Sequence, residues 1–373
     1  MNHPTPAIVS KAAARRLPRL ALVLFCMAYV LPGFIGRDAW KSADMSALGF
    51  MAELAQGTSD WWAPTLLGLP TENPALLPYW LGAWALQGAP AWMAADFAVR
   101  IPFAFLMTLA LIATWYGTYY LGRSPKAQPV AFAFGGEALP KDYARAMADG
   151  SLLAMIGCLG LAQLSHETTP ALSQLGFAAL FYFGMAALPY RRSIPLIAVA
   201  IGMAGLALSG APAIATMWAL GAIIIHFADR SREEGTVTGA SRIAAESAAI
   251  LLFTIAVAAL TSKLGLWRWK VELPRALWTD WNGYAQLLIW FTWPAWPLAL
   301  WTVWRWRHQL LSPNISRHLA LPLWLCVVAV TATLTTGSSD RTLLLALPAL
   351  ATLAAFALPT ARYGPRNRWS RLL

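Results

Sequence analysis

The chain has 373 residues, of which 58% are hydrophobic and only 12% are charged, and its formal net charge is +11. Globular domains carry roughly a quarter charged residues, so this composition excludes an ordinary water-soluble enzyme. Apolar runs approaching the ~20 residues that cross a bilayer recur along the chain, and none alternates like a membrane β-barrel strand. The sequence predicts an all-α integral membrane protein, in which basic residues gather in cytoplasmic loops rather than bind nucleic acid.

About ten apolar segments are predicted to be transmembrane helices. The first is expected to be retained, because no A-x-A cleavage site follows it. Of the 28 lysines and arginines, 20 fall in one set of alternating loops, which predicts that both termini are cytoplasmic. The predicted spans are residues 18–36, 97–121, 149–165, 170–189, 193–209, 211–228, 243–262, 283–304, 318–336 and 342–360.

The longest predicted outer loop, residues 37–96, carries two apolar stretches that are too short to span the bilayer. Residues 44–56 place their apolar side chains on one helical face, and residues 76–86 are rich in Trp and Tyr, which concentrate at the headgroup layer. We therefore predict two interfacial helices here. The whole chain, 1–373, is predicted to form a single transmembrane domain. Its cytoplasmic loop, 122–148, has no phosphate-binding glycine motif.

Two groups of polar residues lie in this first outer loop. Arg37 and Asp38 directly follow the first span, where a carboxylate can reach both a polar acceptor and a lipid headgroup. Asp38 could equally be the N-cap of the next helix, since Asp caps helices well. Glu72 lies in the turn-rich segment Leu67–Pro74, either as a site residue or as a solvated loop acid.

Two further groups lie in later outer links. His166 and Glu167 occupy a very short link between two spans, and such a pair is costly to bury at a membrane surface without a purpose. No second histidine follows at helical spacing, so this is not a metalloprotease signature. Arg341 precedes the last span, where it could bind a phosphate by charge and fork geometry or anchor the helix at the interface.

In this order, the groups resemble the motifs of the bacterial branch of the GT-C glycosyltransferases, which includes the lipid A aminoarabinose transferases and relatives of the protein O-mannosyltransferases. The chain departs from the family pattern at Ala39, where a second acid is usual, and at Asn73, Ser209 and Ser338, where lysines are usual. The region that usually follows the membrane domain is expected to be absent. The segments that carry the resemblance are Arg37-Asp38-Ala39, Ser59–Pro64, Glu72-Asn73-Pro74, Tyr79-Trp80, Ala98–Pro102, His166-Glu167, Leu208–Pro212 and Gly337–Leu350.

The resemblance implies transfer of a sugar from a polyprenyl-phosphate donor to a lipid, glycan or protein acceptor, at the periplasmic face of a bacterial inner membrane. The attacked carbon passes through an oxocarbenium-like state, so the acceptor hydroxyl needs a base and the departing phosphate needs positive charge. The expected catalytic residues are Asp38, His166 and Glu167, and the expected substrate-binding residues are Arg37, Glu72, Tyr79, Arg100 and Arg341.

Two other functions are compatible with the sequence. A transporter or flippase of a lipid-linked saccharide would need acids in mid-span and internal repeats, and the sequence shows neither clearly. A degenerate, non-catalytic relative would explain the missing lysines. No cofactor is expected and no metal site is evident, although the outer-face acids could recruit a divalent cation.

Overall fold

The computed structural model describes residues 5–14, 16–36, 38–39, 41–71, 74–229, 239–267, 281–312, 314–335 and 340–361. Over these residues the chain is a bundle of helices with one short hairpin, β1 (Thr65–Leu66) and β2 (Leu69–Pro70). The helices are α1 (Arg19–Phe34), α2 (Ser42–Gln56), α3 (Leu77–Gly88), α4 (Ala95–Gly122), η1 (Pro125–Ala127), α5 (Pro140–Ile156), α6 (Leu159–Leu164), α7 (Pro170–Ala187), α8 (Ser193–Leu208), α9 (Pro212–Ala228), α10 (Ala240–Lys263), α12 (Trp281–Phe291), α13 (Ala295–Arg305), α14 (Arg307–Leu310), α15 (Arg317–Thr335), α16 (Asp340–Leu343), η2 (Leu344–Ala346), α17 (Leu347–Ala355) and α18 (Leu358–Ala361).

The prediction of a helical membrane protein is confirmed. Five helical segments within the described residues are long and apolar enough to cross a bilayer: Ala95–Gly122, Pro170–Ala187, Ala240–Lys263, Arg317–Thr335 and Arg341–Thr360. The helices α1, α8 and α9 are shorter but equally apolar, and each coincides with a predicted span. Large apolar side chains on the outer faces of α1, α8, α9 and α10 are exposed, as expected of surfaces that contact lipid rather than water.

Two predicted spans are wrong as continuous helices. The predicted span 149–165 is divided at Gly157 and Cys158 into α5 and α6, and α5 already begins at Pro140, where proline is well suited to the first helical position. The predicted span 283–304 is divided ahead of Pro294, which lacks an N–H and clashes with the preceding turn of a helix. Counting apolar residues locates such segments but does not detect their breaks.

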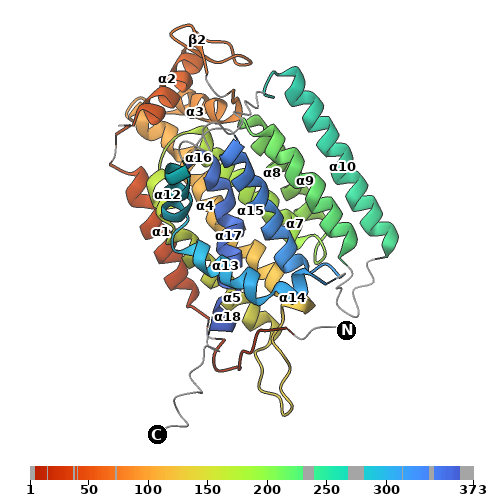
Figure 1. Cartoon of the computed structure of the whole chain (residues 1–373). Coiled ribbons are helices and arrows are strands. Elements are labelled where there is room, and N and C mark those ends of the chain that lie inside the picture. The colour runs from red at the N-terminus through yellow and green to blue at the C-terminus, as the bar shows by residue number, and fades with distance from the viewer. Residues whose placement is uncertain are drawn as a thin grey trace.

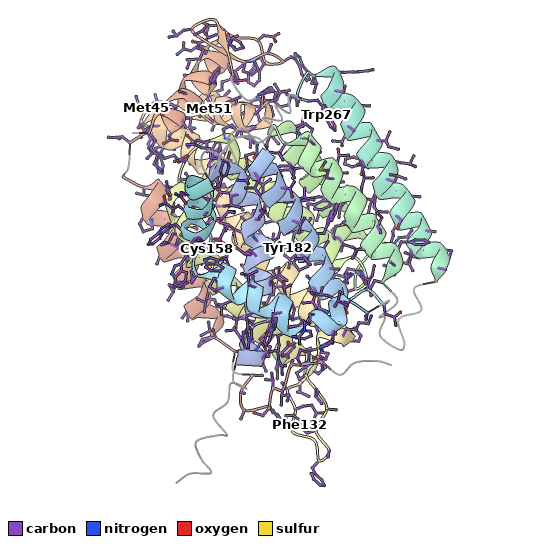
Figure 2. The ribbon with its side chains drawn as sticks, viewed as in Figure 1. Met45, Met51, Phe132, Cys158, Tyr182 and Trp267 are labelled. Atoms are coloured by element: carbon purple, nitrogen blue, oxygen red, sulfur yellow. The ribbon has the colours of Figure 1, made fainter. Side chains whose placement is uncertain are left out.

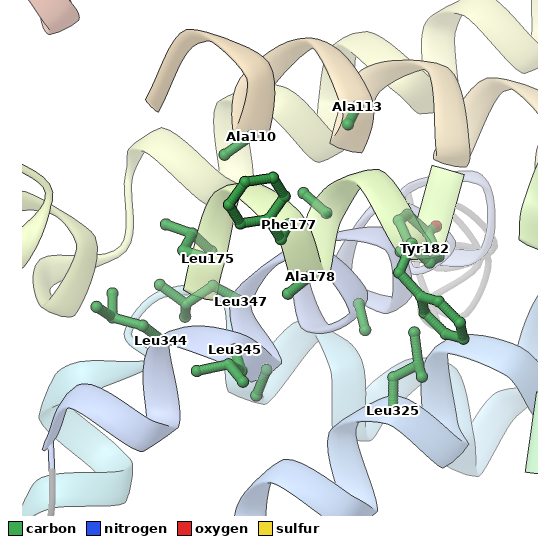
Figure 3. Close-up of a cluster of buried hydrophobic side chains, with 14 of the residues drawn as sticks. Ala110, Ala113, Leu175, Phe177, Ala178, Tyr182, Leu325, Leu344, Leu345 and Leu347 are labelled. Atoms are coloured by element: carbon green, nitrogen blue, oxygen red, sulfur yellow. The ribbon is translucent and has the colours of Figure 1, made fainter. Parts of the chain in front are cut away.

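Helices α4, α7 and α17 form the centre of the bundle (Figure 1). Helix α4 packs against α1, α3, α5 and α7, α7 also packs against α8, and α17 packs against α5, α13 and α15. Helix α10 lies at the outer edge against α8 and α9. Apolar side chains from α4, α7, α15 and the segment η2–α17 meet in one buried cluster (Figure 3).

The end of the bundle that carries α2, α3, the hairpin and the link between α6 and α7 is called the upper end here, and α18, the last described helix, lies at the opposite end (Figure 1). The hairpin turn needs positive φ at both central residues, 52° at Leu67 and 77° at Gly68, as in a type I′ turn. Met51 of α2 is fully buried against Gly82 of α3 (Figure 2). This contact joins the two short helices into one layer over the bundle.

Glycines allow α7 and α8 to approach closely, as small residues do between membrane helices. A Cβ built on Gly184 would lie 2.8 Å from the carbonyl oxygen of Pro195, and one built on Gly202 would lie 2.8 Å from that of Phe177. Both contacts are with backbone, which cannot rotate away. The spacing of α7 and α8 therefore depends on these two residues.

We expect Gly202→Leu to reduce the yield of folded protein strongly, because α8 would have to move away from α7. The measurement is the monodisperse fraction in size-exclusion chromatography after detergent extraction. Ile201→Phe adds bulk to the neighbouring, exposed position and is the matched control. Equal yields for the two variants would contradict this account of the packing.

Candidate active site at the upper end

Glu167, in the link between α6 and α7, holds two basic side chains. Its Oε1 accepts a hydrogen bond from Lys41 Nζ at 2.7 Å, and its Oε2 accepts one from Arg341 Nη2 at 3.3 Å. The carboxylate is buried, with 1% of its side chain exposed. A buried charge is tolerated only when it is paired, and here each oxygen has its own cation. Glu167 and Arg341, both predicted from the sequence, are thus brought together.

The exposed part of this cluster is cationic. The side chain of Lys41 is 23% exposed and that of Arg341 38%, whereas the carboxylate between them is closed off. A ligand arriving from outside therefore meets the two cations rather than Glu167.

Asp44 fixes the link that carries Glu167. The Asp44 carboxylate is buried, and its Oδ1 accepts hydrogen bonds from the backbone N–H of Thr168 at 2.7 Å and from the Thr168 hydroxyl at 2.6 Å. Asp44 lies in the first turn of α2, where a negative charge is also favourable to the helix dipole. Because Thr168 directly follows Glu167, these hydrogen bonds also fix the position of Glu167 relative to α2.

His166 faces α1 and is half-buried. Its Nε2 lies 3.0 Å from the carbonyl oxygen of Tyr29, to which it donates, so in the neutral ring Nδ1 accepts from the Ser165 hydroxyl at 3.0 Å. The ring packs between Tyr29 and Phe34 and against Gly33. These contacts indicate that His166 attaches the link to α1, while its predicted catalytic role stays a prediction.

Asp38 is exposed and lies three residues before Lys41. Because consecutive Cα atoms are 3.80 Å apart, the Cα of Asp38 can lie at most about 11 Å from that of Lys41. The alternative that Asp38 caps the next helix is wrong, because α2 begins at Ser42 with Lys41 at its N-cap position. Asp38 is therefore an exposed carboxylate that precedes Lys41 by three residues, without a capping role.

Tyr79 and Arg100 are placed away from solvent. Tyr79 of α3 packs against Phe50 of α2 with ring centroids 5.1 Å apart, and burial raises the pKa of its phenol to about 12. Arg100 is buried in α4, with Nη2 3.8 Å from Asp96 Oδ2. Among the described residues, the Glu167 side chain is hydrogen-bonded to Lys41 and Arg341 rather than to Tyr79 or Arg100.

Arg37 and Glu72 lie outside the described residues, as do Asn73 and Ser338. The segment that follows Glu72 is placed: Leu76 N–H donates to the Leu208 carbonyl at 2.9 Å. Gly210 has φ 95°, and a Cβ there would lie 2.7 Å from the Pro74 carbonyl oxygen, so glycine is required. Pro74 and Gly210, which belong to two different sequence motifs far apart in the chain, are therefore in contact.

The sequence interpretation missed Lys41 and Asp44 as parts of the site. Each is an ordinary residue type for a loop or first helical turn at a membrane surface. Only their spacing after Asp38, by three and six residues, could have suggested them. Within the ranges that the structure describes, no three His, Cys, Asp or Glu side chains gather around a common point that could hold a metal ion.

Comparison with solved structures identifies the architecture. ArnT from Cupriavidus metallidurans in the apo state matches with a TM-score of 0.56 and 13% sequence identity, and the match covers 95% of this chain. The same protein bound to undecaprenyl phosphate matches with a TM-score of 0.58, 14% identity and 95% coverage. The chain has an ArnT-like fold, of the GT-C type.

The ArnT-like fold was predicted from the motifs, and this prediction is confirmed. The matches cover 62% and 63% of the ArnT chains, so this chain spans less than two-thirds of the ArnT length. No protein-family model matches the chain, and no curated protein sequence matches it significantly. The likeness is one of fold rather than of sequence.

We expect Asp44→Asn to lower the free energy of unfolding by about 1.5–3 kcal/mol, the usual contribution of a hydrogen bond to a charged group. Both Thr168 donors would then face a neutral, weaker acceptor. The measurement is thermal unfolding in detergent, with Asp60→Asn at an exposed loop position as the control. An unchanged melting temperature in Asp44→Asn would contradict the anchoring role.

Proposed function

We propose that this protein is a membrane glycosyltransferase. It moves a sugar from a polyprenyl-phosphate-linked donor to a lipid, glycan or protein acceptor at the periplasmic face of a bacterial inner membrane. The observation that carries this proposal is the cationic pair Lys41 and Arg341, held by buried Glu167. Asp38 precedes Lys41 by three residues in the chain. The cationic pair occurs in a fold shared with ArnT, for which a complex with undecaprenyl phosphate is known.

The proposed topology places both termini in the cytoplasm and the upper end in the periplasm. The distribution of basic residues supports this orientation. In it, about ten segments cross the bilayer within a single transmembrane domain, and α2 and α3 lie along the outer interface within the loop 37–96. An interfacial site of this kind admits a lipid-linked donor from the bilayer and an acceptor from outside.

The proposed reaction is a direct displacement at the anomeric carbon. Asp38 takes the proton of the acceptor hydroxyl as its oxygen forms the new bond to that carbon. The bond between the same carbon and the phosphate oxygen breaks, and its electron pair leaves with the phosphate. A positive charge stabilises the charge that develops there, and Arg341 is placed in the cluster that can supply it. One displacement inverts the configuration at the carbon.

The remaining predicted contacts are assigned to the substrates. We propose that Arg37, Glu72 and Arg100 contact the donor or the acceptor, and that Tyr79 shapes the wall of the site from α3. Buried Tyr79 would act through packing, because a phenol with a pKa of about 12 stays neutral at physiological pH. His166 holds the link between α6 and α7 in position beside the sugar.

The test is turnover of radiolabelled polyprenyl-phosphate sugars by the purified chain in detergent. A transferase consumes donor there, whereas a transporter or flippase needs a sealed membrane and leaves donor intact. Asp38→Asn is expected to lower the rate by at least ~100-fold, the lower range for loss of a general base. Glu53→Gln is the control, because glutamine keeps the acceptor for the Leu67 N–H. A fully active Asp38→Asn protein would refute the assignment of the base.

A further inference from the structure

The buried carboxylate of Glu167 lies between two basic side chains, Lys41 and Arg341, that are otherwise suited to bind an anion. Lys41 and Arg341 are both partly open to solvent, yet both are already bonded to Glu167. A bound phosphate would seek the same N–H donors. Glu167 and an incoming phosphate are therefore competitors for one pair of cations.

Arg341 and the link that carries Glu167 also keep polar groups without a partner. Within the described part of the chain, Nε of Arg341 is buried and makes no hydrogen bond. The same holds for the hydroxyl of Thr169, a residue that is 2% exposed and forms the N-cap of the 18-residue helix α7. A buried polar group without a partner is destabilising, so a ligand that bonds to it is favoured.

The lysines that are usual in the resembling family do not account for the positive charge in this chain. Asparagine or serine stands at all three positions, Asn73, Ser209 and Ser338. Ser209 is fully buried and is hydrogen-bonded to Ser173 at 2.6 Å, so it is not available to a ligand. Lys41 brings a lysine to the cluster from another part of the chain.

Resting on the proposed function, we propose that Lys41 and Arg341 together bind the phosphate of the lipid carrier, and that Glu167 competes with it for them. Glu167 is a positioning residue in this proposal: it sets the cations in place and limits how tightly the carrier phosphate is held. Lys41 is then a binding residue that the sequence interpretation did not identify.

The charges of donor and product explain what such competition achieves. The donor phosphate is a diester, with one negative charge. After transfer the carrier is a phosphate monoester, which at pH 7 carries about −1.5 to −2 because its second pKa is about 6. Without Glu167 the two cations would retain this product more tightly than the donor. The buried carboxylate therefore favours release of the product.

The test is direct binding of undecaprenyl phosphate to the purified full chain in detergent, without an acceptor. Lys41→Met is expected to weaken binding by about tenfold or more, as loss of a charge-assisted hydrogen bond does, and Lys41→Arg to restore it. Glu167→Gln keeps the shape of the side chain but removes its charge, and is expected to tighten binding by roughly the same factor while turnover falls. Lys263→Met, at an exposed position on α10, and Glu53→Gln are the matched controls.

Two further ligands identify what is bound. Undecaprenol, which lacks the phosphate, should bind the five variants alike, and inorganic phosphate should compete with the lipid in the wild-type chain. Weaker binding in Glu167→Gln than in the wild type would overturn the competition. Unchanged binding in Lys41→Met would overturn the role of Lys41, even if Glu167→Gln did not fold. Binding that follows the expected pattern without any sugar transfer would refute the proposed transferase while leaving this inference intact.

Discussion

The upper end of the bundle depends on a single electrostatic constraint: the buried carboxylate of Glu167 must remain paired with basic side chains. Glu167 is closed off from solvent and is held by Lys41 and Arg341, residues that are 126 and 174 positions away in the chain. Removing either cation would leave a buried charge half-compensated, which is among the most destabilising changes in a protein. The start of α2, the link between α6 and α7 and the start of α16 are therefore required to meet at one point.

Neighbouring polar contacts hold the same point from other sides. Asp44 binds Thr168 from α2, and Tyr29 binds Ser165 and His166 from α1. Each of these contacts ends in the link of residues 165–169, which has no regular structure to position it. These polar contacts therefore hold the link in place. In the bundle below it, the helices are held by apolar packing instead, and the close approach of α7 and α8 requires glycine.

The comparison with ArnT shows how far a GT-C fold persists without its sequence. At 13–14% identity the helices still superpose over 95% of this chain, because membrane helices are constrained by length and apolarity more than by residue identity. The resembling family usually carries lysine at three motif positions, and this chain has Asn73, Ser209 and Ser338 there. Ser209 forms a buried hydroxyl pair with Ser173. Lys41 is the lysine that is hydrogen-bonded to Glu167.

Composition and hydropathy alone established the membrane class and located most of the helices, because crossing a bilayer requires long apolar segments whatever the fold. The order of the motifs was also sufficient to predict the fold family and to select Glu167 and Arg341. The sequence could not show the breaks at Gly157 and Pro294, since apolar residues lie on both sides of each. Nor could it show that Lys41 binds Glu167, because an ion pair between distant residues is set by how the helices pack and leaves no local pattern. Only the tertiary structure decided which charge is buried and which charges remain open to a ligand.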